Sequence, residues 1–125
     1  MSTNVYLKNV LIADNSGPIY LRVSGPNSSL ENVTITNNGG GLHVGGGDDP
    51  VFNPGISINN TIIAHNGPNP SEFNSQFIAA PANTLEVDVF VEYSLINGFW
   101  GIVGAPGSEN LSISPNPYSI MFQHF

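Results

Sequence analysis

The chain has no cysteine and only two basic residues, Lys8 and Arg22, against nine acidic ones. Without cysteine there is no disulfide framework, no thiol nucleophile and no Cys-ligated metal site. The formal net charge of −7 argues against nucleic acid and anionic membranes as partners, because both need clusters of Lys and Arg to meet phosphates. We therefore expect neither nucleic-acid nor membrane-surface binding.

Long apolar runs are also missing. No segment approaches the length of a membrane span, and residues 1–4 lack the basic and apolar regions of a signal peptide. What the chain has instead is turn-forming residues, with 14 Gly and 10 Pro among 125 residues. This composition disfavours long helices, and the length suits a single domain spanning residues 1–125.

Four segments of the sequence align with one another without gaps. They are residues 7–15, 30–38, 58–66 and a degenerate copy at 91–99. Two columns of the alignment are aliphatic in every copy, and we expect them to form the core: Leu7, Leu30, Ile58 and Val91 in one, and Ile12, Ile35, Ile63 and Ile96 in the other. The alternation and the β-branched content favour a strand in each copy.

A bend is expected inside each copy and a turn after it. Leu7 and Val10 are three residues apart, so both can point inward only if the chain bends at or near Asn9. Asn and Gly clusters follow each strand, and in most copies a second short strand comes next, as at residues 19–23. A unit of about 23 residues built this way predicts one rung of an all-β parallel solenoid of about five rungs.

Asparagine recurs in two further columns. Asn9, Asn32 and Asn60 form one and Asn15, Asn38 and Asn66 form the other. Stacked rungs would bring each column into register, where amide side chains hydrogen-bond along the stack, so we interpret both as structural ladders. Beside the first column, Lys8 and Glu31 are expected to form a surface ion pair across rungs.

The residues resemble a known family. Residues 32–44 and 60–66 are similar to rungs of right-handed parallel β-helices of the pectin-lyase-like superfamily. Residues 91–101, followed by 109–117, resemble the closing rungs of bacterial cell-surface β-helix proteins, whose motif has two Asp where this chain has Ser112 and Ser114. The resemblance implies a single-stranded right-handed parallel β-helix and an extracellular or cell-surface location.

The same resemblance directs attention to Arg22, because pectate-lyase-type enzymes on this fold use a basic residue to take a proton and carboxylates to hold calcium. Arg22 is the one candidate catalytic residue, and no acidic cluster accompanies it in sequence. Polygalacturonase-like hydrolysis needs paired carboxylates at a defined separation. We expect no catalytic site and no resident cofactor, with calcium the one cation to consider.

The adjacent acids Asp48 and Asp49, together with Asn53, are the candidate calcium ligands, because hard cations prefer oxygen ligands. The competing interpretation is a solvated turn. Residues 85–92 alternate acidic and apolar positions and predict a half-buried strand with a wet acidic face. No His-x-x-x-His spacing links His43, His65 and His124, so they are not expected to bind metal.

The remaining expectations concern inserts and ends. Extra length enters at residues 45–55 and 67–84, which we interpret as insert loops, and the glycine triplets at 39–41 and 45–47 are expected to be turns. Residues 104–125 are expected to cap the C-terminal end. The repeat begins almost at once and shows no capping helix, so the N-terminal end is predicted to associate with another copy or with upstream rungs of a longer protein.

Two functions from different classes follow. The favoured one is a non-enzymatic β-solenoid module with a structural, adhesive or self-assembling role. The alternative is a carbohydrate-active domain, a polysaccharide lyase, hydrolase or glycan binder, with a groove along one sheet walled by the inserts.

Overall fold

The computed structural model describes residues 4–47, 54–79, 87–97 and 111–113. The prediction of an all-β chain is confirmed, because the described residues form ten strands and one four-residue helix. In chain order these are β1 (Tyr6–Ala13), β2 (Ile19–Val23), β3 (Ser28–Thr36), β4 (Leu42–Gly46), β5 (Gly55–Asn59), β6 (Ile62–Ala64), α1 (Phe73–Gln76), β7 (Phe77–Ala79), β8 (Asp88–Glu92), β9 (Leu95–Ile96) and β10 (Leu111–Ile113).

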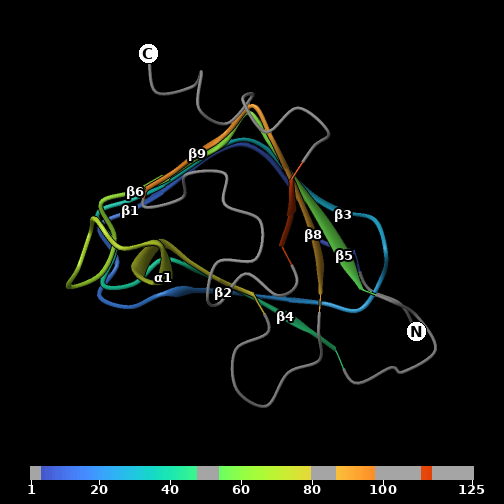
Figure 1. The fold of residues 1–125 in the computed structure, drawn as a ribbon, viewed down its shortest axis with the longest axis horizontal. Coiled ribbons are helices and arrows are strands. Elements are labelled where there is room, and N and C mark those ends of the chain that lie inside the picture. Colours follow the sequence, from blue (N-terminus) through green and yellow to red (C-terminus); the bar gives the residue numbers. More distant parts are fainter. Residues whose placement is uncertain (1–3, 48–53, 80–86, 98–110, 114–125) are drawn as a thin grey trace.

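The strands form two parallel sheets. A seven-stranded sheet has the order β10-β8-β5-β3-β6-β9 with β1 paired to β3, and a three-stranded sheet has the order β2-β4-β7. The larger sheet is curled, because β3 pairs with β5 through its first half and with β6 through its second half. Figure 1 shows the two wings of this sheet and the smaller sheet enclosing a roughly triangular core.

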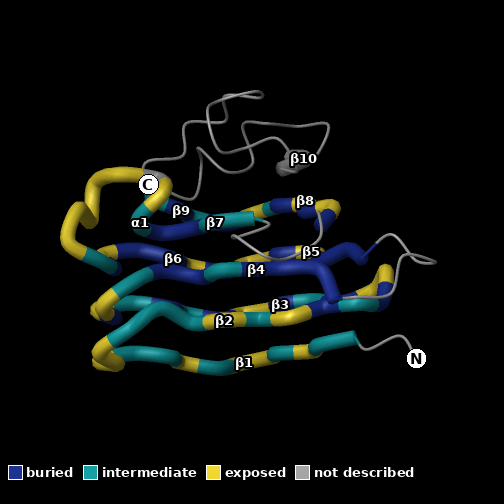
Figure 2. The backbone as a smooth tube through the Cα atoms, turned by 90° about the horizontal axis from the view of Figure 1, so that it is seen from below, coloured by how far each residue is buried: buried dark blue, intermediate teal, exposed yellow. Residues whose placement is uncertain are grey.

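The chain runs through both sheets in successive layers, which Figure 2 shows stacked one above another. The first layer contains β1 and β2, the second β3 and β4, the third β5, β6, α1 and β7, and the fourth β8 and β9. The strand register places the aliphatic columns in line, with Leu7 opposite Leu30, Ile12 opposite Ile35, and Ile63 opposite Ile96. Leu30 in turn lies opposite Ile58, which lies opposite Val91.

The bend predicted near Asn9 is confirmed. Asn9 has a φ of 56°, in the left-handed region, and the equivalent residues Asn32, Asn60 and Tyr93 have φ of 53°, 52° and 47°. A second left-handed column, Asp14, Asn37 and His65, follows the strands. Asn and Asp tolerate this backbone better than other residues with a Cβ, which explains why polar residues recur at the corners.

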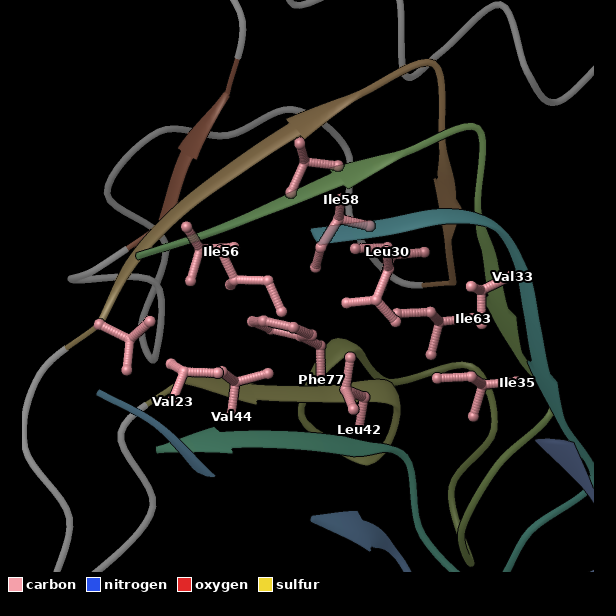
Figure 3. Close-up of a cluster of buried hydrophobic side chains, with 14 residues drawn as sticks. Val23, Leu30, Val33, Ile35, Leu42, Val44, Ile56, Ile58, Ile63 and Phe77 are labelled. Atoms are coloured by element: carbon pink, nitrogen blue, oxygen red, sulfur yellow. The ribbon is translucent and has the colours of Figure 1, made fainter. Parts of the chain in front are cut away.

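The core fills the space between the two sheets (Figure 3). Leu30, Ile35, Ile58 and Ile63 from the larger sheet meet Val23, Leu42, Val44 and Phe77 from the smaller one, and all are at most 1% exposed. Val91 and Ile96 are also fully buried. Leu7 and Ile12, from the same two columns, are only half-buried, because β1 has a neighbouring strand on one side alone within the described residues.

Two segments expected as loops or turns contain regular structure. Gly45 and Gly46 belong to β4, where they pair with Arg22 and Val23, so parallel pairing with β2 overrides the turn tendency of glycine. Residues 67–84 contain α1 and β7, and Phe77 of β7 is a core residue. Of the predicted capping segment 104–125, only β10 lies among the described residues.

We predict that Tyr93→Asn stabilises the protein by about 1 kcal/mol, because Asn adopts the left-handed backbone at this corner at lower cost than Tyr. The ring is 54% exposed, so its removal sacrifices little packing. Urea unfolding measures the difference. Tyr93→Ala is the control and should give no gain, and a loss of stability in Tyr93→Asn would contradict the corner argument.

Candidate functional site

The most distinctive polar feature is a column of amide side chains along one corner of the stack, exposed at its first residue, Asn15, and buried from Asn38 onward. We call it the inner amide column, and it consists of Asn15, Asn38, Asn66 and Gln76. In each step a side-chain oxygen accepts two hydrogen bonds from the preceding residue of the column. Asn38 Oδ1 accepts from the backbone N–H and from Nδ2 of Asn15, at 3.0 and 2.8 Å. Asn66 Oδ1 accepts from the same two groups of Asn38, both at 3.0 Å.

The amide nitrogens of this column also bind strand ends. Asn66 Nδ2 donates to the carbonyl oxygens of Ile35 and Ala64, at 3.0 and 3.1 Å, and Asn38 Nδ2 does the same for Ile12 and Thr36. Asn66 is fully buried. One amide nitrogen therefore serves as hydrogen-bond donor to a strand-end carbonyl of its own layer and to one of the layer before it.

Gln76 ends the inner amide column, and sequence reasoning missed it. Its Oε1 accepts from the backbone N–H and from Nδ2 of Asn66, both at 3.0 Å. Its Nε2 then donates to the carbonyl oxygens of Asn66 and Pro70, at 2.8 and 3.0 Å. Gly41 makes room for this residue, because a Cβ there would lie 1.9 Å from the Gln76 carbonyl oxygen. The only sequence signal is that this glutamine stands just before the apolar residues 77–79.

A second, exposed column runs along the left-handed corner. We call it the outer amide column, and it consists of Asn9, Asn32 and Asn60, with Tyr93 in the fourth position. Asn32 Nδ2 donates to Asn9 Oδ1 at 3.0 Å, and Asn60 Nδ2 donates to Asn32 Oδ1. The hydrogen bonds thus point toward the first layer, opposite to those of the inner column. Because water competes for these exposed groups, this column contributes less to stability than the inner one.

Buried hydroxyl groups serve the residue that follows the left-handed corner. Thr61 Oγ1 accepts from the backbone N–H of Val33 at 3.4 Å, and Ser94 Oγ accepts from that of Thr61 at 3.1 Å. Thr61 and Ser94 are each 1% exposed. Their position on the inward face is explained by this hydrogen bonding rather than by hydrophobic packing.

The N-terminal layer of the stack is formed by β1 and β2. Among the described residues β1 pairs only with β3 and β2 only with β4, so the outer edge of each strand carries no described strand, and we call this edge the open N-terminal end. The inward-facing side chains of this layer, Leu7, Val10, Ile12, Ile19 and Leu21, pack against the core but stay half-exposed. In Figure 2 this layer is coloured intermediate or exposed along most of its length, whereas the layers above it contain long buried stretches.

Lys8 and Glu31 form the ion pair expected from the sequence, with Nζ and Oε1 3.5 Å apart. Their side chains are 63% and 48% exposed, so solvent screens the pair and its contribution is a few tenths of a kcal/mol. Lys8 keeps further ammonium donors, because one ammonium group carries three.

The outer face of the three-stranded sheet carries Tyr20, Arg22 and His43. Tyr20 is 69% exposed and meets the His43 ring edge to face, with centroids 4.9 Å apart. Arg22, the candidate catalytic residue, is exposed on β2 opposite Gly45. His43 Nδ1 is buried without a hydrogen-bond partner, and burial lowers the pKa of His43 below 6.5.

The other candidates are not brought together. Asp48, Asp49 and Asn53, the candidate calcium ligands, lie outside the described residues, as do Glu86 and His124. Asp88 is exposed and Glu92 half-buried on β8, and His65 lies at an exposed corner. Within the described part of the chain, no three acidic or His side chains are grouped so that they could hold a metal ion.

We predict that Asn66→Ala destabilises the protein by about 3 kcal/mol or more. It leaves the backbone N–H of Asn38 and the carbonyls of Ile35 and Ala64 buried without this partner. Asn9→Gly is the matched control in the exposed column, since glycine keeps the left-handed backbone, and it should cost about 1 kcal/mol or less. Denaturant unfolding compares the two, and equal losses would contradict the primacy of the inner column.

We predict a pH-dependent loss of stability from His43. Its folded-state pKa lies below the unfolded value of 6.5, so the unfolded chain binds the proton more readily. Stability therefore falls as the pH drops through 6.5 and stops falling once the folded-state pKa is passed. Unfolding at pH 8 and pH 5 should show a smaller difference for His43→Phe than for the wild type. An unchanged difference would refute the assignment.

No family model, curated protein or solved structure matches the chain. Among the described residues, no helix has the length and apolar character needed to cross a membrane. The candidate functional features of this protein are therefore those that its own geometry supplies: two directional amide columns, an open N-terminal end, and an exposed Tyr and Arg on the smaller sheet.

Proposed function

We propose that the protein is a right-handed parallel β-helix of the pectin-lyase-like type, about five rungs long. Three observations support this. All strand pairs between described residues are parallel. Successive layers pair equivalent residues 23 positions apart at the start of the chain, as with Leu7 and Leu30. Left-handed corner residues recur in two columns, in all four layers in one column and in the first three layers in the other.

On this fold the protein acts as a non-enzymatic module of the cell surface or extracellular space, with a structural, adhesive or self-assembling role. The observation that carries this proposal is the open N-terminal end, where two strand edges and five half-exposed aliphatic side chains lie together. An open edge of this kind offers backbone hydrogen-bonding groups and an apolar face to another chain.

The oligomeric state in solution tests this function. We expect concentration-dependent association by size-exclusion chromatography with light scattering, and stacked particles by electron microscopy. Leu7→Lys places a charge on the open end and should abolish association. Leu11→Lys is the control, because Leu11 is 67% exposed on the outer face of β1 and should leave association intact. A wild-type monomer at high concentration would overturn the self-association part of the proposal.

A second function, binding or cleavage of an acidic polysaccharide, is supported by the outer face of the smaller sheet. Tyr20 offers an exposed ring on which a sugar can pack, and Arg22 lies two residues along the same strand face. Binding and cleavage assays with and without calcium test this function. The assays with calcium are included because Asp48, Asp49 and Asn53 are the candidate calcium ligands. A dilute monomer that binds or cleaves the polysaccharide, and loses this in Arg22→Ala, would establish the carbohydrate-active function over the structural one.

A further inference from the structure

The hydrogen bonds of the two amide columns leave defined groups at the N-terminal end. In the inner column each side-chain oxygen accepts from the preceding residue of the column, so the Oδ1 of Asn15, the first residue, receives no hydrogen bond from a described residue. In the outer column each amide nitrogen donates to the layer before it, so the Nδ2 of Asn9 has no acceptor among the described residues. The end thus offers one acceptor and one donor at fixed positions.

Among the described residues, the opposite end of the columns does not supply the complementary groups. Gln76 ends the inner column, and its Nε2 is already shared between the carbonyls of Asn66 and Pro70. Tyr93 stands where the outer column would have its fourth amide. In a copy stacked head to tail, neither Gln76 nor Tyr93, the last described residues of the two columns, would therefore offer an amide to Asn15 Oδ1 or Asn9 Nδ2.

Charge adds a third constraint. Both basic residues of the chain, Lys8 and Arg22, lie in the first layer. Asp14 is the only acidic residue of that layer, and the other acidic residues come later in the sequence. Within the stack, the residue above Lys8 is Glu31, and the two form an ion pair. An acid on the other side of Lys8 would meet the same ammonium group.

We propose that the N-terminal end binds a parallel β-coil of a partner polypeptide, one that carries an amide side chain in each of the two columns and a carboxylate facing Lys8. Its strands extend the sheets beneath β1 and β2 and cover Leu7, Val10 and Ile12. The inner amide donates to Asn15 Oδ1, the outer amide accepts from Asn9 Nδ2, and the acid pairs with Lys8. The proposal rests on association through this end and specifies the chemistry of the occupant.

The second layer of the protein provides a probe with this chemistry. A capped synthetic peptide of residues 28–46 carries Glu31, Asn32 and Asn38 at the positions equivalent to Lys8, Asn9 and Asn15. Titrated into the isotope-labelled protein, it should shift the NMR signals of residues 5–23 and not those of the fourth layer. The peptide with Asn32→Ala and Asn38→Ala should bind at least about tenfold more weakly, since it lacks the amides of both columns.

Glu31→Lys in the peptide tests the charge. It should weaken binding by about threefold at low salt and less at high salt, as expected for an exposed pair. No binding at millimolar concentration, equal binding by the double Ala peptide, or signal shifts away from residues 5–23 would each overturn the proposal.

If the peptide aggregates, the proposal is tested instead with a chain to which a copy of the second layer is fused. Residues 1–3 are replaced by a copy of residues 28–46 followed by Ser-Gly-Pro, the sequence of residues 24–26, so that Asn4 takes the place of Asn27. We expect the midpoint of thermal unfolding to rise by about 4 °C or more, and to rise clearly less with both Asn of the copy changed to Ala. Equal rises would overturn the proposal.

These results separate the two proposals. A native chain that stays monomeric but binds the peptide retains the further inference and loses self-assembly. A native chain that associates equally well after Asn9→Gly with Asn15→Ala retains self-assembly and loses the amide requirement.

Discussion

The structure depends on the buried hydrogen bonds between amide side chains at the inner corner. Each layer must turn there, and the turn leaves backbone N–H and carbonyl groups facing the interior, where an unpaired group costs about 1–3 kcal/mol. Asn and Gln carry both a donor and an acceptor on one side chain. The oxygen of Asn66 accepts hydrogen bonds from the layer before it, and its nitrogen donates to the carbonyl at the end of its own strand. Asn66 makes five such contacts while fully buried. The aliphatic columns supply the hydrophobic free energy, and the amides hold the layers in register.

A directional column gives the stack two different ends. Among the described residues, the inner column begins with Asn15 Oδ1, an acceptor without a donor, and ends with Gln76, whose Nε2 donates to the carbonyls of Asn66 and Pro70. The outer column begins with Asn9 Nδ2, a donor without an acceptor among the described residues, and has Tyr93 in its fourth position. Together with the open edges of β1 and β2, this polarity is why the proposed association takes place at the N-terminal end and why a partner needs amides of its own.

Much of the fold could be predicted from the sequence, because short-range rules govern it. The gapless alignment contains the spacing of the core columns, and the three-residue step from Leu7 to Val10 requires a bend at Asn9. Gln76 could not be found this way, since it lies ten residues after Asn66 in a segment without periodicity, and only the fold brings the two together. Gly45 and Gly46 have strong turn tendencies that pairing with β2 overrides. The contact of Tyr20 with His43 likewise depends on strand register.

The decisive measurement is native-state hydrogen exchange of the backbone N–H groups of Asn38 and Asn66, because both donate to side-chain oxygens of the inner column. If the inner column holds the layers together, these two groups exchange only through global unfolding, at the same free energy as core strand residues such as Ile35 and Ile63. Exchange of Asn38 and Asn66 through local opening, with Ile35 and Ile63 still protected, would contradict this role, because the column would then be a surface detail rather than the element that holds the layers together.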